Sequence, residues 1–407
     1  MADDAHAAPS GPHGPLHGLT VLDLTRVLSG PYCTMLLGDM GARIIKIERP
    51  GRGDDTRGWG PPFIDGESAY FLSINRNKES VTLDFKQPEG RRVLDALIAR
   101  ADVLVENFRP GTLARLGLGY DDLKARFPRL VYCSISGFGQ TGPRRDGPGY
   151  DAILQAEGGL MSITGAADGP AYRLGVAIAD IVTGLFAAQG ITMALFARER
   201  GGAGQYVDIG MLDSVAALLS YQAAIYFATG AAPGRMGNRH PTIVPYETFE
   251  TADGEIVIAV GNEELWRTFC AAIGLDELTA DPRFVANRDR VSNYDLLRPI
   301  LSDRLREHSR QYWLDRLTGA GVPAGSVRDL HEVFTDPQLL ARAMIAAVEH
   351  PAAGPLRLLG VPVKLSETPG SVRRPPPLLG EHTEQVLTVD AGLDRAAVAH
   401  LRARHVI

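Results

Sequence analysis

Short apolar runs alternate with longer helical segments through the first half of the chain. Helical spacing of apolar positions marks residues 31–40 and 88–100, and two long apolar helical segments follow at 181–198 and 211–229. The runs with the length and composition of buried strands are 19–24, 43–47, 80–83, 103–106, 130–134 and 205–210. Because strands that alternate with helices form parallel sheets, we expect an α/β fold. Its sheet should be doubly wound, mostly parallel and Rossmann-like, with helices on both faces.

The pattern changes after about residue 230. Two strand-like runs at 246–251 and 255–260 flank Ala252-Asp253-Gly254, a turn sequence typical of a β-hairpin. Further helical and strand-like segments follow at 263–273, 294–307, 310–320 and 322–327. We therefore expect a large α/β domain at 18–229, a smaller α+β domain at 230–330, and a return at 331–407. The return contains a Pro-rich linker near 373–377 and a terminal helix from about residue 382.

Composition narrows the class of protein. The chain has 407 residues, more than one hydrophobic core usually organises, and its net charge of -6 argues against a nucleic-acid or anionic-membrane partner. No window approaches the roughly 18 consecutive apolar residues of a membrane span. Cys33, Cys133 and Cys270 are too widely separated for a disulfide framework or a zinc site. We expect a cytoplasmic protein without a metal, and a disordered tail at residues 1–17 that lacks the apolar core of a secretory signal.

One carboxylate, Asp180, lies in an otherwise uncharged and largely apolar run from Leu174 to Gly184. Desolvation raises the pKa of a buried carboxyl group unless hydrogen bonds or opposite charges compensate. Asp180 is therefore either a partnered residue, such as the cap of the helix that follows, or a functional one.

Basic residues recur at the ends of the predicted strands. Ligands of open α/β sheets bind beyond the carboxyl ends of the strands, and guanidinium groups match the geometry of phosphate. Together these residues predict a crevice for a polyanion such as a phosphorylated adenosine, whereas any one of them alone is explained as part of a solvated charged rim. They are Arg49, Arg52, Arg76, Lys78, Arg109 and Arg115.

Glycines and motifs refine this prediction. The run from Gly137 to Pro143 directly follows a predicted strand, so its backbone N–H groups can approach a ligand closely, unless it is a plain wide turn. The strand-to-helix segment at 21–31 does not contain G-x-G-x-x-G, which disfavours an NAD-dependent redox enzyme. The chain also lacks the ATP or GTP loop and the G-x-S-x-G elbow of serine hydrolases. His240 is a candidate base or anion binder, although a lone loop histidine is more often neither.

Several segments together resemble the family III CoA-transferases, which include formyl-CoA transferase, the carnitine CoA-transferases and α-methylacyl-CoA racemase. The resemblance spans about residues 18 to 390. It rests on 22–63 (LDLTRVLSGP to GWGPPF), 73–86 (SINRNKESVTLDFK), 101–120 (ADVLVENFRPGTLARLGLGY), 134–165 (SISGFGQTGP to LMSITG) and the surroundings of Asp180. The SINRNKES and GWGPPF variants look most like the dicarboxylate-using branch, which implies succinyl-CoA as a donor.

The resemblance implies roles for individual residues. Asp180 would be the nucleophile, which carries the acyl group as an aspartyl anhydride and then CoA as an aspartyl-CoA thioester. CoA would be a substrate, with no permanently bound cofactor, and two chains would interlock as a homodimer. Oxyanion donors are expected among Gly137 to Gly142 and at Gly237. The expected CoA contacts are Val27, Arg49, the run from Asn75 to Lys78 with Arg76, Asn107, Arg109, Arg115, Gly137, Phe138 and Tyr150.

Two departures limit this transfer of roles. Tyr150 stands where the racemases of the family carry a histidine that is one of their two acid/base groups. Leu28 stands where the formyl-CoA and oxalate enzymes carry glutamine, and 236–240 replaces their glycine-rich loop, which argues against formate and oxalate. The leading hypothesis is thus an acyl-CoA:carboxylate CoA-transferase. The alternatives are an acyl-CoA racemase or isomerase on the same fold, and a CoA-binding protein without catalysis.

Overall fold

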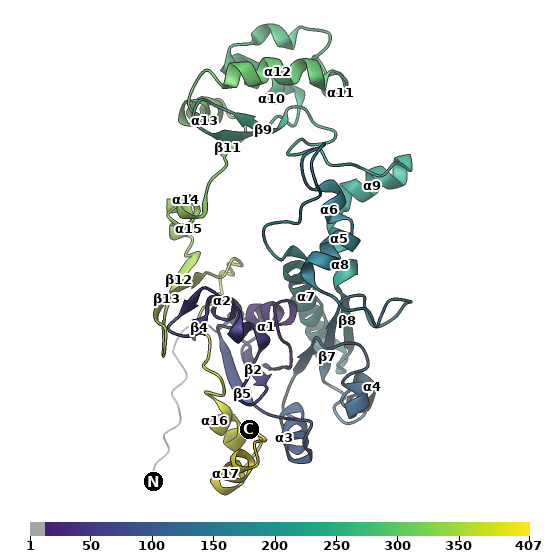
Figure 1. Ribbon diagram of the computed structural model, residues 1–407, viewed down its shortest axis with the longest axis vertical. Helices are drawn as coiled ribbons and strands as arrows, with labels where there is room; N and C mark the ends of the chain where they lie inside the picture. Colours follow the sequence, from purple (N-terminus) through teal and green to yellow (C-terminus); the bar gives the residue numbers. More distant parts are fainter. Residues whose placement is uncertain (1–12) are drawn as a thin grey trace. The chain divides into compact units, whose positions relative to one another are not determined.

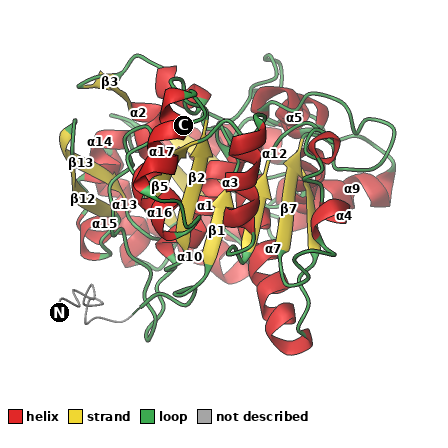
Figure 2. Cartoon of the chain, turned by 90° about the horizontal axis from the view of Figure 1, so that it is seen from below, coloured by secondary structure: helices red, strands yellow, loops and turns green. Residues whose placement is uncertain are grey.

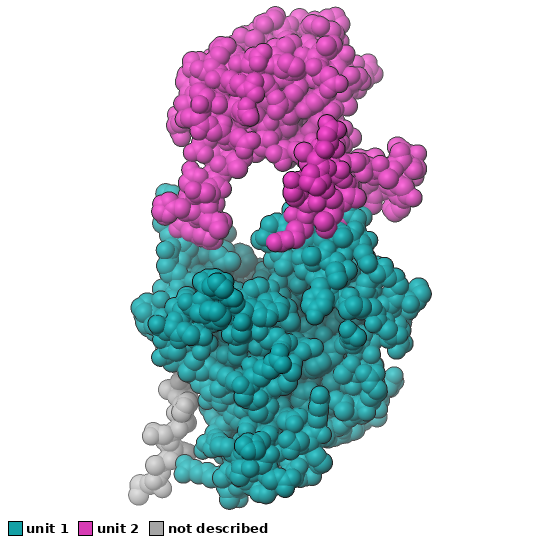
Figure 3. All heavy atoms as spheres, in the orientation of Figure 1, with its two compact units in different colours: residues 1–159, 174–220, 337–407 teal, residues 160–173, 221–336 magenta. Residues whose placement is uncertain are grey.

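A computed structural model describes residues 13–407 of the chain. The chain divides into two compact units, coloured separately in Figure 3. Unit 1 contains the chain up to Gly159 together with Leu174–Ser220 and Pro337–Ile407, and unit 2 contains Leu160–Arg173 and Tyr221–Asp336.

Unit 1 is organised around a six-stranded sheet in which every neighbouring pair of strands is parallel. Its order is β5-β2-β1-β6-β7-β8, so the chain moves outward in one direction from β1 and then in the other from β6. This arrangement confirms the α/β prediction and places the point of reversal between β1 and β6, where doubly wound sheets bind ligands. The strands are β1 (Thr20–Asp23), β2 (Arg43–Glu48), β5 (Lys78–Thr82), β6 (Val103–Glu106), β7 (Val131–Ser136) and β8 (Tyr206–Gly210).

Helices cover both faces of this sheet, as Figures 1 and 2 show. Successive strand residues point to opposite faces, so Val21 packs with α1 (Ser29–Asp39) and α7 (Ile178–Gly201) in one core. Leu22 packs in the other core with α3 (Pro88–Ile98), α16 (Thr383–Val389) and α17 (Arg395–Ala403). Because both faces are buried, the strands read as nearly continuous apolar runs.

The long helix α7 is apolar enough to cross a membrane by length and composition alone, as is the bent pair of α8 and α9 taken as one span. In unit 1, one face of α7 packs against α1, β7 and β8. The remaining elements of unit 1 are β3 (Phe63–Ile64), β4 (Glu67–Ser68), α2 (Ala69–Ile74), α4 (Tyr120–Leu123), α5 (Asp151–Glu157), α8 (Met211–Leu218), α15 (Pro337–Ala341) and the antiparallel pair β12 (Ile345–His350) and β13 (Gly354–Leu359).

Unit 2 is an α+β unit with its own core. A three-stranded antiparallel sheet in the order β11-β10-β9 packs against helices around the buried rings of Trp266, Phe269 and Trp313. Its elements are α6 (Leu160–Ile163), α9 (Ser220–Thr229, with Ser220 in unit 1), β9 (Tyr246–Glu250), β10 (Glu255–Ala259), α10 (Glu263–Ile273), α11 (Asn287–Ser292), α12 (Tyr294–Leu305), α13 (Arg310–Gly319), β11 (Ala324–Ser326) and α14 (Leu330–Phe334).

Three predicted elements differ from the structure. The single helix expected at 211–229 is two helices bent by 76°, because Ser220 adopts a left-handed backbone with φ of 41° that interrupts the helix. The single terminal helix is also two, since Gly392 turns the chain with φ of 71° and Asp394 caps α17. The tail expected at 1–17 falls mostly outside the described residues, but Leu16 is anchored by a 2.9 Å hydrogen bond from its N–H to the Met40 carbonyl.

Candidate active site

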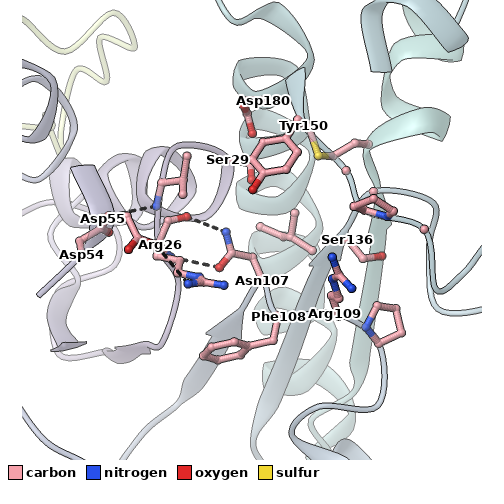
Figure 4. A pocket seen from close by; sticks show the side chains of 18 of the residues that line it. Arg26, Ser29, Asp54, Asp55, Asn107, Phe108, Arg109, Ser136, Tyr150 and Asp180 are labelled. Carbon is pink, nitrogen blue, oxygen red and sulfur yellow. Dashed lines mark hydrogen bonds and ion pairs between the residues drawn. The ribbon is translucent and has the colours of Figure 1, made fainter. Parts of the chain in front are cut away.

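A cavity of about 800 Å³ opens beyond the carboxyl ends of β1, β6 and β7 in unit 1. This is the point of reversal of the sheet, so the topology alone predicts a ligand there. Figure 4 shows Asp180 and Ser29 together at one end of the cavity, with Arg26, Asn107 and Phe108 farther along. Its lining includes Arg26, Val27, Ser29, Arg49, Arg52, Asn107, Phe108, Arg109, Ser136, Gly137, Gly149, Tyr150 and Asp180.

Asp180 lies in the first turn of α7 and is half-buried. Burial and the nearby charge of Asp151 raise the pKa of Asp180 to about 6, against the opposing effect of the hydroxyl and the backbone N–H of Ser29. The helix cap that sequence reasoning considered for Asp180 is instead Asp151, whose Oδ1 accepts hydrogen bonds from the N–H groups of Ala179 at 2.8 Å and Asp180 at 3.3 Å. Asp180 is thus left facing the cavity.

The turn after β1 forms the wall beside Asp180 and is held in an unfavourable conformation. Val27 has φ of 69°, a left-handed backbone that a β-branched residue rarely adopts. Its N–H donates to Asp54 Oδ1 at 3.2 Å, and the amide of Asn107 pairs with both backbone groups of Arg26 at 2.7 and 3.0 Å. Buried Lys46 contacts Asp54 at 2.9 Å and the Thr25 carbonyl at 2.8 Å. Such strain persists only where surrounding contacts fix it, often at functional sites.

The rim of the cavity carries an excess of positive charge. Arg26, Arg49 and Arg52 all pair with one carboxylate, Asp55, at 3.1, 3.8 and 3.2 Å. Arg109 forms no ion pair with any residue in 13–407. Several guanidinium groups that share one carboxylate retain donors and charge for an anionic ligand.

A second cavity, of about 820 Å³, adjoins the first at the ends of β1, β2 and β6. The two share Arg26, Arg49, Asp54, Phe108 and Arg109. The second is more apolar, with Leu83, Phe85 and Leu116 in its wall and Lys86 at its edge. Together they can hold a long ligand with an apolar part and several negative charges.

Most of the predicted site residues line the first cavity. These are Val27, Arg49, Asn107, Arg109, Gly137, Tyr150 and Asp180. Gly137 lies against Gly149 so closely that a Cβ on Gly137 would be 2.6 Å from the Gly149 Cα, so only glycine fits there. Residues 137–142 also match G-x-G-x-x-G, but no helix begins directly after them, since α5 starts only at Asp151. This distinguishes the loop from the dinucleotide-binding motif, in which the glycines lead into a helix.

Arg76 and Lys78, which were also predicted as ligand contacts, lie outside the linings of both cavities. Both are buried: Arg76 pairs with Asp39 at 2.7 Å and Lys78 with Asp23 at 3.1 Å. The physical reason is the direction of the strand: Arg76 precedes β5 and Lys78 is its first residue, so both lie at its amino end, whereas ligands bind at the carboxyl end.

Four other candidates also lie outside the linings. Arg115 is exposed and donates to Thr112, a residue of the second cavity. Phe138 stacks under the Arg144 guanidinium at 4.1 Å. His240, in unit 2, stacks on the ring of Tyr246 at a centroid distance of 5.2 Å and lies against the tilted ring of Tyr221 at 5.3 Å. Gly237 is in unit 2 as well.

Sequence reasoning missed the residues that support the site. Ser29, Asp54 and Glu106 act through contacts with other elements, and no motif marks them. Asn107, in the same turn as Glu106, was found only through the family resemblance. Glu106 is buried, accepts a hydrogen bond from the Phe108 N–H at 2.8 Å and another from the Ser134 hydroxyl. A single charged residue, Glu106, at the end of a buried apolar strand was the available signal.

A carboxylate at the reversal point of a doubly wound sheet, beside a rim of arginines, is the site of an enzyme that acts on an anionic substrate. CoA-transferase family III matches residues 16–383, so the chain belongs to that family and is a CoA-transferase, which confirms the resemblance. It is similar to succinyl-CoA:glutarate CoA-transferase of Mus musculus, with 45% identity over 97% of this chain and 90% of that protein. It is also similar to acetyl-CoA:oxalate CoA-transferase of Acetobacter aceti, with 45% identity over 88% of this chain and 91% of that protein. A solved CAIB/BAIF family protein from Brucella suis superposes with a TM-score of 0.82 and 42% identity, covering 94% of this chain and 100% of that one.

Proposed function

We propose that this enzyme moves CoA from a dicarboxylic acyl-CoA to a carboxylic acid, with Asp180 as the covalent carrier. The observation that carries the proposal is a half-buried carboxylate that faces a cavity rimmed by arginines. Exchange of CoA between two carboxylates is nearly thermoneutral, so the enzyme needs a carrier rather than an energy source. A carboxylate nucleophile that splits one difficult step into easier ones fits that need.

The chemistry takes four addition steps. A carboxylate oxygen of Asp180 attacks the carbonyl carbon of the donor thioester, the C–S bond breaks, and an aspartyl-acyl anhydride and CoA thiolate form. The thiolate attacks the carboxyl carbon of Asp180, which releases the donor acid and leaves an aspartyl-CoA thioester. The acceptor carboxylate attacks that carbon and releases the thiolate, giving a new anhydride. The thiolate then attacks the acceptor's carbonyl carbon and frees the Asp180 carboxylate.

We place CoA across the two adjoining cavities. The thioester lies at Asp180, the pantetheine arm passes Asn107 and Gly137, and the phosphates face Arg26, Arg49, Arg52 and Arg109. The mixed apolar and basic wall of the second cavity suits an adenine ring and its phosphate. Arg115, at the edge of that cavity, is the one predicted contact outside the linings that this placement keeps.

The acids are proposed to be dicarboxylates. Relatives that are 45% identical carry succinyl, glutarate and oxalate in their names, and all three acids have two carboxyl groups. The sequence argument against oxalate therefore does not decide the acceptor, and oxalate belongs among the acids to be tested. A surplus of guanidinium groups beside the reaction centre gives a second carboxylate a partner.

We further propose that the enzyme is an interlocked homodimer. Exposed apolar side chains form a stripe along α7 through Leu185, Met193 and Phe196, which are 47%, 61% and 64% exposed. Exposed stripes of this kind mark contacts with another protein. The segment 360–382, after β13, contains neither helix nor strand, as expected of a segment that threads through a partner.

The test is a substrate panel. Purified enzyme is incubated with succinyl-CoA and, one at a time, with acetate, oxalate, glutarate and longer dicarboxylates, and the CoA thioesters are separated by chromatography. We expect transfer to at least one dicarboxylate and a loss of all transfer in Asp180→Asn. Retained transfer in that variant, or solvent deuterium entering the α-position of an acyl-CoA without an acceptor, would instead support a different role for Asp180.

A further inference from the structure

Ser29 lines the same cavity as Asp180 and lies beside it in Figure 4. It is the first residue of α1, is 4% exposed and lines the cavity. The Ser29 and Asp180 side chains lie beside each other in Figure 4, and the hydroxyl and backbone N–H of Ser29 act to lower the pKa of Asp180 against the effect of burial. Gly184, one turn along α7, makes this approach possible, because a Cβ there would lie 2.7 Å from the Ser29 carbonyl oxygen.

We propose that the Ser29 hydroxyl is a further catalytic group, which stabilises the negative charge that forms on the Asp180 carbonyl oxygen when a nucleophile attacks the acylated side chain. This inference rests on the proposed function, because it requires Asp180 to be the carrier.

This role follows from the fate of the two carboxyl oxygen atoms of Asp180 during the reaction. An acylated carboxyl group has one oxygen in the new bond and one carbonyl oxygen. Ser29 lies to one side of the Asp180 carboxyl group, so we assign the oxygen farther from Ser29 as the nucleophile, and the oxygen nearer Ser29 becomes the carbonyl oxygen. When the donor acid leaves, it carries away the oxygen that attacked, whereas the oxygen near Ser29 stays on the enzyme.

Two of the four additions then place a full charge beside Ser29. In the second step the CoA thiolate adds to the Asp180 carbonyl carbon, the π electrons move onto the carbonyl oxygen, and they return as the donor carboxylate departs. In the third step the acceptor carboxylate adds to the same carbon, and the electrons return as the thiolate departs. No proton is transferred, so the hydroxyl acts only as a hydrogen-bond donor.

A hydroxyl in this place favours the transition state over the intermediate that precedes it. The carbonyl oxygen is neutral in the anhydride and the thioester and charged in each tetrahedral intermediate, so the hydrogen bond strengthens as the reaction proceeds. Asp151, whose Oδ1 is bonded to the N–H groups beside Asp180, places a negative charge close to that oxygen. A donor from Ser29 offsets this repulsion.

The experiment measures two rates for Ser29→Ala: kcat with the best acceptor, and the rate at which donor acyl-CoA alone forms the aspartyl-CoA thioester, followed by rapid quench and intact mass. Loss of one oxyanion donor typically costs about 10²–10³ in kcat, and the N–H of residue 29 remains, so we expect both rates to fall by roughly 10- to 100-fold. The KM for acyl-CoA should change by less than about twofold, because the lost bond is not to the substrate.

Three further variants separate catalysis from folding. Ser29→Thr keeps the hydroxyl and should retain most of kcat, whereas Ser29→Cys keeps the size but is a weak donor and should behave like alanine. Ser214→Ala is the matched control, because Ser214 is also 4% exposed and its hydroxyl donates within α8 to the Gly210 carbonyl at 2.8 Å. That control should leave both rates unchanged.

The outcomes distinguish this inference from the proposed function. Wild-type protein that forms no adduct on Asp180 overturns the proposed function whatever Ser29→Ala does. Wild-type protein that forms the adduct while Ser29→Ala and Ser29→Cys form it equally fast overturns the role of Ser29 alone. A raised KM with unchanged kcat in Ser29→Ala would also overturn it, since that pattern belongs to binding.

Discussion

Asp180 is costly to ionise, and its surroundings control how costly. The carboxylate must lose water to face the cavity, and Asp151 adds repulsion, while the hydroxyl and backbone N–H of Ser29 favour the charged form. A nucleophile balanced in this way is reactive because it is poorly solvated, but it is not permanently neutral. Its charge state near neutral pH is therefore sensitive to both neighbours.

This balance predicts a pH dependence. Because burial and Asp151 raise the pKa of Asp180 to about 6, kcat/KM should fall roughly tenfold per pH unit below about pH 6, as the nucleophile becomes protonated. Rates with succinyl-CoA across the pH range, with unfolding monitored in parallel, give the measurement. A profile that stays level well below that pH, with the protein folded, contradicts the assignment.

A second prediction concerns the arginine rim. Arg49→Ala should raise the KM for acyl-CoA about tenfold or more with a smaller change in kcat, because a bond to the distal nucleotide is the same in substrate and transition state. Arg129→Ala is a matched control: Arg129 is an exposed arginine that pairs with Glu199 and precedes β7, at the opposite edge of the sheet. An equal rise in KM in both variants would mean that Arg49 acts only through the overall charge of the protein and not through a direct contact with the nucleotide.

At the residue scale, the sequence indicated which side chains have the right chemistry better than it indicated where they lie in the fold. Asp180 was recognisable because a lone carboxylate in an apolar run requires a partner or a function, and Arg49 and Arg109 because they follow strands. Arg76 and Lys78 are cations too, but they lie at the amino end of a strand, where their side chains complete buried ion pairs. Ser29 carried no signal, since its role depends on the approach of α1 to α7.

At the scale of elements, two turns shape the site. Asn107, in the turn after β6, bonds to the Arg26 backbone in the turn after β1 and so joins the two turns. Glu106 holds the second turn by accepting a hydrogen bond from the Phe108 N–H. Burial raises the pKa of Glu106 to about 7, with a further contribution from Asp208, although hydrogen bonds from Ser134 and Phe108 favour its charged form. A carboxyl group whose pKa is raised by folding destabilises the folded protein at any pH at which the unfolded chain is more ionised.

Glu106→Gln should therefore stabilise the protein in a pH-dependent way. Below the ordinary pKa of glutamate both states are protonated and the substitution gains little. As pH rises from there through about 7, the wild type loses stability that the variant keeps, by roughly 1–3 kcal/mol. Denaturant unfolding at acidic and mildly alkaline pH measures the difference, with Glu349→Gln, on β12, as the control. A gain that is the same at both pH values would contradict this account.

The elements show why prediction succeeded for the sheet and failed at breaks. Each central strand is buried on both faces, so its apolar run is unambiguous, and the predicted strands all exist within a few residues. The bend between α8 and α9 depends on the backbone angle of Ser220, and the pair β12–β13 depends on cross-strand contacts. Neither feature produces a periodic pattern of apolar residues in the sequence, so neither was predicted.

At the scale of the whole molecule, the apolar stripe on α7 leads to the proposed dimer. Interlocked chains cannot exchange without unfolding, so two differently tagged native preparations should yield no hybrid after mixing, whereas co-expression should yield one. Affinity capture followed by mass analysis reads the result. Hybrids that form within hours under native conditions would rule out threading, and a monomer in light scattering would rule out the dimer itself.

The central claim is that Asp180 carries the acyl group and then CoA, and mass spectrometry tests it most directly. The enzyme is incubated with donor acyl-CoA and no acceptor, divided, and either analysed intact or treated with hydroxylamine and digested. The account predicts a mass increase that corresponds to bound CoA and conversion of Asp180, and no other carboxyl group, to its hydroxamate. An enzyme that transfers CoA at full rate without either signal, or with the hydroxamate at another residue, would contradict it.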